Sequence, residues 1–414
     1  MNNPPLSGLR VLDHGHVWAG PLLGAGFMDM GAEVIKLNAP ARESGISMGG
    51  RQLPGLVDKG VVIDREDPYN YHGFDRGKLS ITLDLQSERG IELYKRLVET
   101  SDVAVENFSP GVMDSLGIGY GALSAKNPRI ILASLSATGD TDGPWRDLIT
   151  YGPSLAALYG IKSLLGYTDD PMPREDTADL DPTAAGHAFF AILAALEYRE
   201  RTGLGQHIDM AQGEATLQRI GEPMMDYFMN GRVAGPQGNR YPGMAPHGIY
   251  RTAGDDQWIS ISVRDDDEWV ALLDLAGGSA AALRDPAFSS REQRLAAQDE
   301  LDAAVEGWTA GQDAMELTQV LQAAGVPAYP VAGPPEMLAD ENFEYVRRQH
   351  VGIADGLPVA ADQIYTGIVW KLPKSPGVIK GPLPELGSGN DHVFGELLGL
   401  TDAERQELRS QGVI

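Results

Sequence analysis

The chain has 414 residues, of which 33 are Lys or Arg and 58 are Asp or Glu, and its formal net charge is -25. A negative field of this size repels phosphate backbones and anionic lipid surfaces, so nucleic-acid and membrane partners are not expected. The absence of cysteine excludes disulfides, thiolate metal sites and cysteine nucleophiles. No signal-peptide pattern and no long apolar segment is found, so we expect a cytoplasmic protein.

The first elements predicted along the chain form a βαβ unit. Apolar residues at 9–12 and 32–37 indicate strands, and the glycine-rich amphipathic stretch 19–30 between them indicates a helix. Further strands are expected at 79–85, 103–107 and 129–135, and a further helix at 88–99. Strands that alternate with helices predict the α/β class, with a parallel sheet covered by helices.

A long loop is expected between Ala39 and Asp75. Regular periodicity fades there, and glycines and prolines recur throughout the segment. Loops of this length in compact domains usually carry function.

The clearest helix opens at Asp181 and Pro182 and ends at Thr202 before Gly203. Asp at the N-cap, Pro at the first helical position and Gly after the end are typical residues for these positions. A cap of this kind stabilises a helix by about 1 kcal/mol without any catalysis. The same carboxylate also lies at the positive end of a strongly apolar helix, where an anion is stabilised and can meet an electrophile.

A change of pattern after this helix predicts a second domain. A helical run with three methionines leads into the polar loop GNRYPGMAPHG, and an alternating strand pattern follows at 258–263. We therefore expect a large domain that begins with residues 1–224, a small domain at 225–330, and a return to the large domain over 331–414. Thr401 and Glu404 form a capping box that predicts a last short helix.

Several common active-site motifs are absent from the sequence. The glycines of the first βαβ unit do not form G-x-G-x-x-G, and Asn38 stands where a dinucleotide fold places a ribose-binding acid. There is no Walker A motif, no H-E-x-x-H and no G-x-S-x-G. The eight histidines show no metal-ligand spacing, so no metal is expected.

Seven segments, taken in order, resemble the class III CoA-transferases of the CaiB/BaiF type over nearly the whole chain. They are LSGLRVLDHGHVWAGPLLGAGFMDMGAEVIKL, DRGKLSITLDL, DVAVENFSPGVMDSLGIGY, NPRIILASLSATGDTDGP, DLDPTAAGHAFFAILAALEYRERTGLGQHIDMAQGEA, GMAPHGIYRTAG and LGSGNDHVFGELLGL. The resemblance implies a Rossmann-like large domain made from both chain ends, a smaller inserted domain, and an interlocked homodimer.

The resemblance also implies a catalytic aspartate. Its register to the I-L-A-A-L run, which begins at Ile192, selects Asp181, whereas the neighbouring Asp179 misses that register. The implied activity moves CoA between carboxylic acids through a mixed anhydride and an aspartyl-CoA thioester. Acyl-CoA is then a substrate, and no tightly bound cofactor is expected. Backbone near Gly139 and Gly243 could donate N–H groups to oxyanions.

Six residues match the CoA-contact positions of the family: Val17, Trp18, Ala19, Lys78, Asn107 and Phe108. Lys78 would offer positive charge to the phosphates, although an ordinary solvated lysine is the alternative. The sequence departs from the family at three positions near the nucleotide, which are Asn38, Ser115 and Ser136.

Two other functions are compatible with the same fold. An α-methylacyl-CoA racemase needs a histidine base in an A-G-H-D segment, but Tyr151 takes that place here. A CoA-binding subunit of a hetero-oligomeric transferase is the second alternative, against which Asp181 argues. The D-P-T-A and A-P-H-G-I-Y segments resemble members that use succinyl-CoA, including the benzylsuccinate branch, whereas the acids exchanged cannot be assigned from the sequence.

Overall fold

The computed structural model describes residues 3–40, 73–167, 180–341, 348–350, 364–366, 368–381 and 384–414. The chain forms two compact units. The first comprises residues 1–160, 176–225 and 344–414, and the second comprises residues 161–175 and 226–343. Compared with the small domain expected at 225–330, the second unit extends further towards the C-terminus and includes 161–175.

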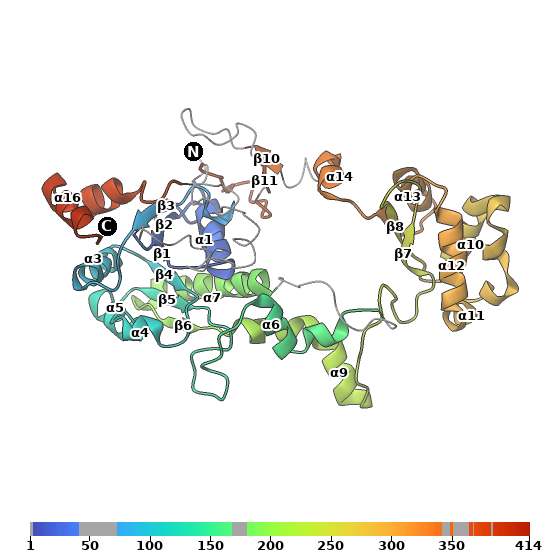
Figure 1. Cartoon of the computed structure of the whole chain (residues 1–414), viewed down its shortest axis with the longest axis horizontal. Helices are drawn as coiled ribbons and strands as arrows, with labels where there is room; N and C mark the ends of the chain where they lie inside the picture. The colour runs from blue at the N-terminus through green and yellow to red at the C-terminus, as the bar shows by residue number, and fades with distance from the viewer. Residues whose placement is uncertain are drawn as a thin grey trace, which may run out of the picture. The chain divides into compact units, whose positions relative to one another are not determined.

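Within the described residues, the first unit is built on six parallel strands in the order β3-β2-β1-β4-β5-β6. Their bounds are β1 (Arg10–Asp13), β2 (Glu33–Asn38), β3 (Leu79–Thr82), β4 (Val103–Glu106), β5 (Ile131–Ser134) and β6 (His207–Asp209). Figure 1 shows them in this order from the top of the sheet to the bottom. The strand order reverses between β1 and β4, as in a Rossmann fold, so the predicted α/β class is confirmed.

Helices cover both faces of this sheet. They are α1 (Ala19–Asp29), η1 (Gly73–Asp75), α3 (Glu88–Glu99), α4 (Val112–Ser115), α5 (Tyr120–Lys126), α6 (Gly152–Leu158), α7 (Leu180–Thr202), α8 (Gln212–Leu217), η3 (Gln218–Ile220), η6 (Asp391–Leu397) and α16 (Asp402–Ser410). The unit also contains a two-stranded sheet of β10 (Arg348–His350) and β11 (Ile364–Thr366). The helix α9 (Gly221–Asn230) begins in the first unit and ends in the second.

Alternate side chains of the strands pack into two separate cores. Val11 and Val103 pack with α1 and α7, whereas Leu12 and Ala104 pack on the opposite face with α3 and α5. This follows from the two-residue period of a strand, which sends neighbouring side chains to opposite faces. The sheet is therefore buried on both sides, which explains the continuous apolar runs in its strands.

The C-terminal segment completes the large domain. The N–H of Gly389 donates to the Ser80 carbonyl at 2.8 Å, and the N–H of Thr82 donates to Asn390 Oδ1 at 2.9 Å. Phe394 is fully buried in the core that contains α3. Both chain ends thus build one domain, as predicted, and the predicted capping box of Thr401 is present at the start of α16.

The second unit has an antiparallel sheet with the strand order β7-β8-β9 and a cover of helices. Its elements are η2 (Ile161–Leu164), β7 (His247–Arg251), β8 (Trp258–Ser262), α10 (Asp266–Ala276), η4 (Gly277–Arg284), η5 (Pro286–Phe288), α11 (Arg291–Ala296), α12 (Gln298–Thr309), α13 (Ala314–Ala323), β9 (Ala328–Pro330) and α14 (Pro334–Ala339). Ile259 and Ile261 of β8 pack against Trp269 and Leu301 in one core. The apolar residues that alternate in the sequence at 258–263 therefore lie on the buried face of a strand.

The predicted bounds agree with the structure for some elements and differ for others. The helix predicted at 88–99 is observed with the same ends, because Ser87 caps it by accepting the N–H of Gly90 at 3.0 Å. The strand β6 was missed, because it is short and both His207 and Asp209 are exposed, so it lacks an apolar pattern. The long loop expected at 39–75 lies largely at 41–72, outside the described residues.

Candidate active site

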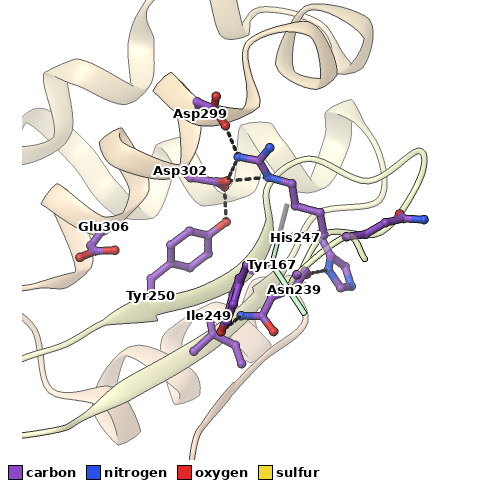
Figure 2. Close-up of a pocket in the computed structure, with 12 residues that line it drawn as sticks. Tyr167, Asn239, His247, Ile249, Tyr250, Asp299, Asp302 and Glu306 are labelled. Carbon is purple, nitrogen blue, oxygen red and sulfur yellow. Dashed lines mark hydrogen bonds and ion pairs between the residues drawn. The ribbon is translucent and has the colours of Figure 1, made fainter. Parts of the chain in front are cut away.

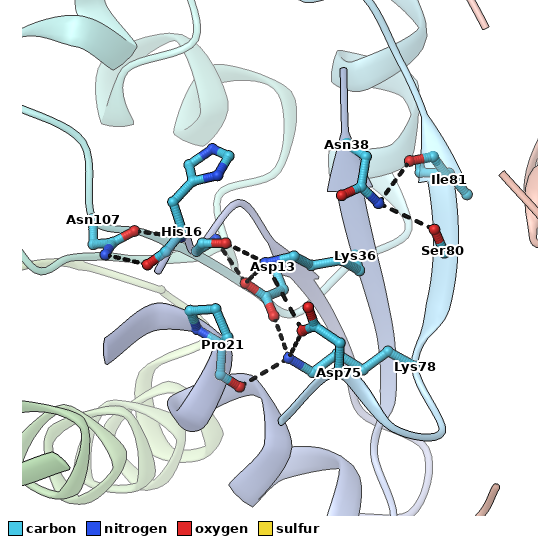
Figure 3. A network of polar contacts seen from close by, with 11 residues as sticks. Asp13, His16, Pro21, Lys36, Asn38, Asp75, Lys78, Ser80, Ile81 and Asn107 are labelled. Atoms are coloured by element: carbon cyan, nitrogen blue, oxygen red, sulfur yellow. Dashed lines mark hydrogen bonds and ion pairs between the residues drawn. The ribbon is translucent and has the colours of Figure 1, made fainter. Parts of the chain in front are cut away.

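The carboxyl ends of β1 and β4 meet where the strand order reverses, which is where open α/β sheets bind ligands. Asn107 directly follows β4. Its Oδ1 accepts the backbone N–H of His16 at 2.7 Å, and its Nδ2 donates to the His16 carbonyl at 2.9 Å (Figure 3). This double hydrogen bond fixes the loop that joins β1 to α1.

The residues after His16 lead directly into α1. Val17 has a φ of 61°, in the left-handed region that a β-branched residue rarely adopts, and such strain is often retained at functional sites. Trp18 stacks on Phe74 with ring centroids 6.0 Å apart, and its buried Nε1 has no hydrogen-bond partner within the described residues. Ala19 is the first residue of α1, so its N–H has no partner within the helix.

Asp181 lies in the first turn of α7, one residue after the helix begins at Leu180. Asp181 is therefore the second helical residue and not the N-cap, so the predicted start of the helix was wrong by two positions. The backbone N–H groups of Ala19 and of Asp181 itself face the Asp181 carboxylate and favour its charged form. Partial burial raises the pKa of Asp181, and these two N–H groups offset part of the increase.

The environment of Asp181 suits a nucleophile. Its pKa is shifted by burial and by N–H donors, and no cation from the described residues contributes to the shift. The start of α7 adds a favourable dipole for the anion. Because no Lys or Arg of the described residues contributes to this shift, the electron pair of the carboxylate is not engaged by an ion pair there and is available for attack.

Phe108 completes the group of predicted residues at this edge of the sheet. Its ring lies 5.4 Å from the His16 ring, and its N–H donates to Glu106 Oε2 at 2.7 Å. Burial raises the pKa of Glu106 to about 7, although hydrogen bonds from Ser134 and Phe108 oppose that increase. Glu106 was not predicted as a site residue. The one sequence feature that marks it is its position as an acidic residue at the end of an apolar strand.

Lys78 is in a different position from the solvated or phosphate-facing lysine expected. It is buried, and its Nζ donates to Asp13 Oδ2 at 2.7 Å, to Asp75 Oδ1 at 2.6 Å and to the Pro21 carbonyl at 2.8 Å (Figure 3). Lys36 lies 3.4 Å from Asp13 Oδ1 in the same cluster. The alternative of a solvated surface lysine was wrong, because Lys78 Nζ faces protein oxygens, whereas contact with CoA phosphates stays a prediction.

The two glycines considered as oxyanion donors lie in different units. Gly139 has a φ of 89° in the loop after β5, and Asp209 holds this loop by accepting the N–H groups of Asp140 at 2.8 Å and Thr141 at 3.0 Å. Gly243 has a φ of 86° in the second unit. Both positions need glycine for their backbone conformation, and their role as donors stays a prediction.

The positions that depart from the family differ in their surroundings. Asn38 Nδ2 donates to Ser80 Oγ at 3.1 Å, which ties β2 to β3. Ser115 is exposed at the end of α4, whereas the hydroxyl of Ser136 is buried without a hydrogen-bond partner within the described residues. Tyr151, which replaces the racemase histidine, is 56% exposed and precedes α6.

The second unit contains a polar cavity of about 490 Å³ that includes part of the GNRYPGMAPHG loop (Figure 2). Arg240 pairs with Asp299 at 2.5 Å and with Asp302 at 2.7 Å, and the Tyr250 hydroxyl donates to Asp302 at 2.8 Å. His247 Nδ1 lies 2.6 Å from the Asn239 carbonyl. These contacts fix the loop against α12, so its charged residues are used within the unit itself.

The described parts of the chain hold no cluster of three or more His, Cys, Asp or Glu side chains suited to a metal ion. The same residues include no helix with the length and apolar character needed to cross a membrane.

A six-stranded parallel sheet with a reversal in its strand order and helices on both faces places this chain in the α/β class with a Rossmann-like domain. The sequence profile of CoA-transferase family III matches residues 6–390. The chain therefore belongs to this family and is a CoA-transferase. The predicted resemblance and enzyme class are confirmed.

Relatives cover the whole length of the chain. A succinyl-CoA–D-citramalate CoA-transferase of Chloroflexus aurantiacus is 34% identical, with 99% of this chain and 98% of the relative covered. The beta subunit of a succinyl-CoA–L-malate CoA-transferase of the same organism is 31% identical, with 99% and 98% covered. The crystal structure of a CaiB/BaiF family protein from Brucella suis has a TM-score of 0.81 and 29% identity, with 96% and 100% covered.

Proposed function

We propose that this CoA-transferase moves CoA from succinyl-CoA to a carboxylic acid acceptor through covalent intermediates on Asp181. The observation that carries the proposal is the Asp181 carboxylate at the start of α7, which the N–H of Ala19 faces and whose pKa no cation of the described residues shifts. Succinyl-CoA is proposed as the donor because two relatives that span the chain carry it in their names. Their other substrates, citramalate and malate, suggest a hydroxydicarboxylate acceptor.

In the first half-reaction, an oxygen of Asp181 attacks the thioester carbonyl of succinyl-CoA. A C–O bond forms, the C–S bond breaks, and the products are a mixed anhydride and the CoA thiolate. The thiolate then attacks the Asp181 carbonyl of the anhydride and releases succinate, which leaves an aspartyl-CoA thioester. No proton has to be removed from carbon in either step, so the missing histidine at Tyr151 is no obstacle.

In the second half-reaction, the acceptor carboxylate attacks the aspartyl-CoA thioester and again forms a mixed anhydride. The CoA thiolate attacks the acceptor carbonyl, and Asp181 leaves as a free carboxylate. The difficult exchange is thus divided into acyl transfers of moderate difficulty. The N–H of Ala19 orients the carboxylate at each stage, and burial of Asp181 limits competing water.

Of the six residues matched to the CoA contacts of the family, five are proposed to bind CoA: Val17, Trp18, Ala19, Asn107 and Phe108. These five lie in the segments that follow β1 and β4, and Asn107 orders the first of these segments through His16. Helix starts and free N–H groups at this edge suit the anionic thioester ligand. Lys78 fits direct contact least well, because its ammonium is already bound by three protein oxygens.

The assembly is proposed to be a cytoplasmic homodimer. A hetero-oligomer is the second candidate, because one relative that covers the chain is named a beta subunit. Exchange activity of the purified chain alone would support the homodimer. Activity that appears only with a homologous partner would support the hetero-oligomer.

The proposal is tested by trapping the intermediate. The purified protein is incubated with succinyl-CoA, quenched and digested, and the peptides are analysed by mass spectrometry. We expect an adduct on the peptide that contains Asp181, which is absent in Asp181→Ala and retained in the neighbouring control Asp179→Ala. An adduct that maps to another residue, or that survives in Asp181→Ala, would overturn the assignment.

A further inference from the structure

The Lys78 ammonium joins three parts of the first unit. It donates to Asp13 at the end of β1 at 2.7 Å, to Asp75 in η1 at 2.6 Å and to the Pro21 carbonyl in the first turn of α1 at 2.8 Å. An ammonium group has three hydrogens. All of them are therefore committed to protein oxygens, and the side chain of Lys78 is 0% exposed.

The pKa shifts of Lys78 and Asp13 both favour the charged forms of these side chains. Burial alone would lower the pKa of Lys78, but Asp13 and Asp75 raise it. Burial alone would raise the pKa of Asp13, but Lys36 and Lys78 lower it. Buried ion pairs contribute little to stability compared with apolar packing, so geometry is the better explanation for a cluster of this kind.

The helix α1 is seated directly on the cluster. A Cβ at Gly24 would lie 2.4 Å from Asp13 Oδ2 and 2.9 Å from Lys78 Nζ. In the loop before α1, a Cβ at Gly15 would lie 2.5 Å from the Gly20 backbone. Only glycine permits these approaches, so the position of α1 is determined by contact with the cluster.

The same turn of α1 holds the nucleophile. Pro21, which accepts from Lys78, is two residues after Ala19. Ala19 packs in the same core as Ala185 of α7, one turn after Asp181, and the Ala19 N–H faces the Asp181 carboxylate. A shift of this turn would move the Ala19 N–H relative to Asp181. Displacements of about 1 Å in such an arrangement can reduce rates about a hundredfold.

We propose that Lys78 is a positioning residue: it fixes the first turn of α1 so that the Ala19 N–H holds the Asp181 carboxylate, and it does not contact the phosphates of CoA. The inference rests on the proposed role of Asp181. It assigns Lys78 a task that differs from the one expected from the sequence.

The test compares Lys78→Met with the wild type on two donors. Succinyl-CoA carries the nucleotide phosphates, whereas succinyl-pantetheine has the same thioester and no phosphate. A positioning role predicts that kcat falls about a hundredfold with both donors. It also predicts that the acid limb of the pH profile moves to higher pH, because the N–H of Ala19 lowers the pKa of Asp181.

The matched control is Asp29→Asn. Asp29 forms a largely buried ion pair with Arg76 at 2.8 Å, at the opposite end of α1 from Ala19. Its loss should change kcat less than about threefold with either donor, because it leaves the first turn of α1 in place. A large loss in this variant as well would overturn the inference, since any buried ion pair would then have the same effect.

Three outcomes overturn the positioning role. They are an increase in KM for succinyl-CoA that is absent with succinyl-pantetheine, an unchanged kcat in Lys78→Met, and an unchanged acid limb. If Lys78→Met does not fold, the variant Asp75→Asn decides the question. It removes the negative charge of one partner of Lys78 and keeps the ion pair between Lys78 and Asp13. A fall in its kcat with both donors supports the role, and wild-type values overturn it.

Failure of this inference is distinguishable from failure of the proposed function. Wild-type protein that forms no adduct on Asp181 contradicts the proposed function. Wild-type and Lys78→Met proteins that form the Asp181 adduct at equal rates contradict only the role of Lys78.

Discussion

Asp13 and Asp181 are two carboxylates beside opposite ends of the loop that enters α1, and they differ in their burial and in the groups that face them. Asp13 is fully buried between Lys36 and Lys78, which lower its pKa. Asp181 is partly buried beside N–H donors alone, and burial raises its pKa. The comparison indicates that the partner decides the role: a carboxylate paired with cations holds structure, and one held by N–H groups can react.

The largest expected effect is on the reactive carboxylate. Asp181→Asn keeps the size of the side chain but removes the nucleophile, so the rate of CoA exchange should fall about a thousandfold or more. Urea denaturation should show little change in stability, because no ion pair is lost. Exchange at near wild-type rates in Asp181→Asn would place the nucleophile elsewhere.

The second effect is on the structural carboxylate. Asp13→Asn leaves two buried lysine ammonium groups with less compensation, so the free energy of unfolding should fall by about 3–5 kcal/mol. The contrast is Glu92→Gln, which removes an exposed pair with Arg89 at 2.7 Å and should cost at most about 1 kcal/mol. Equal stability of these two variants in urea would break the distinction between the carboxylates.

Glu106 offers a third carboxyl group, buried without a cation. Burial raises its pKa from 4.5 to about 7, so between these values the folded state binds a proton that the unfolded state has lost. The contribution of Glu106 to stability is therefore largest below pH 4.5 and is lost as the pH rises to about 7.

Glu106→Gln should remove this loss, which is at most about 3 kcal/mol. The difference in unfolding free energy between the wild type and Glu106→Gln should change over this window. The difference isolates Glu106 from His14 and His16, whose burial lowers their pKa values to about 3 and about 4 and gives the opposite slope. A difference that does not vary with pH would contradict the raised pKa.

The smallest expected effect concerns the seat of α1. Gly24→Ala would place a methyl group 2.4 Å from Asp13 Oδ2, and overpacking of this kind typically costs about 1–3 kcal/mol. Gly186→Ala in α7 has no atom within 4 Å of the new Cβ and should stabilise the helix by about 0.5–1 kcal/mol. Thermal denaturation of the pair checks the prediction, and equal melting temperatures would contradict it.

Much of the fold could be predicted from local pattern. The alternation of strands and helices indicated the parallel sheet, whereas the choice of Asp181 came from the register that the family resemblance implies. The start of α7 was misplaced by two residues, because Asp followed by Pro imitates a cap and first helical position. The start of a helix depends on backbone contacts that the residue types do not reveal.

The charged cluster could not be predicted in the same way. Lys78 and Asp13 are 65 positions apart, and a lysine in a polar stretch gives no local signal of burial. The cluster exists because β1, β2 and the segment before β3 become neighbours in the sheet. The approach of the Ala19 N–H to Asp181 likewise depends on the packing of α1 against α7, which is a tertiary contact.

The central claim is tested most directly with an acceptor whose carboxylate carries oxygen-18. In each turnover with succinyl-CoA, the proposed sequence returns one acceptor oxygen to Asp181 when the second anhydride is cleaved. Digestion and mass spectrometry should then find one oxygen-18 atom on the Asp181 peptide after a single turnover, and only when both substrates are present. Product that forms while this peptide stays unlabelled would contradict covalent catalysis by Asp181.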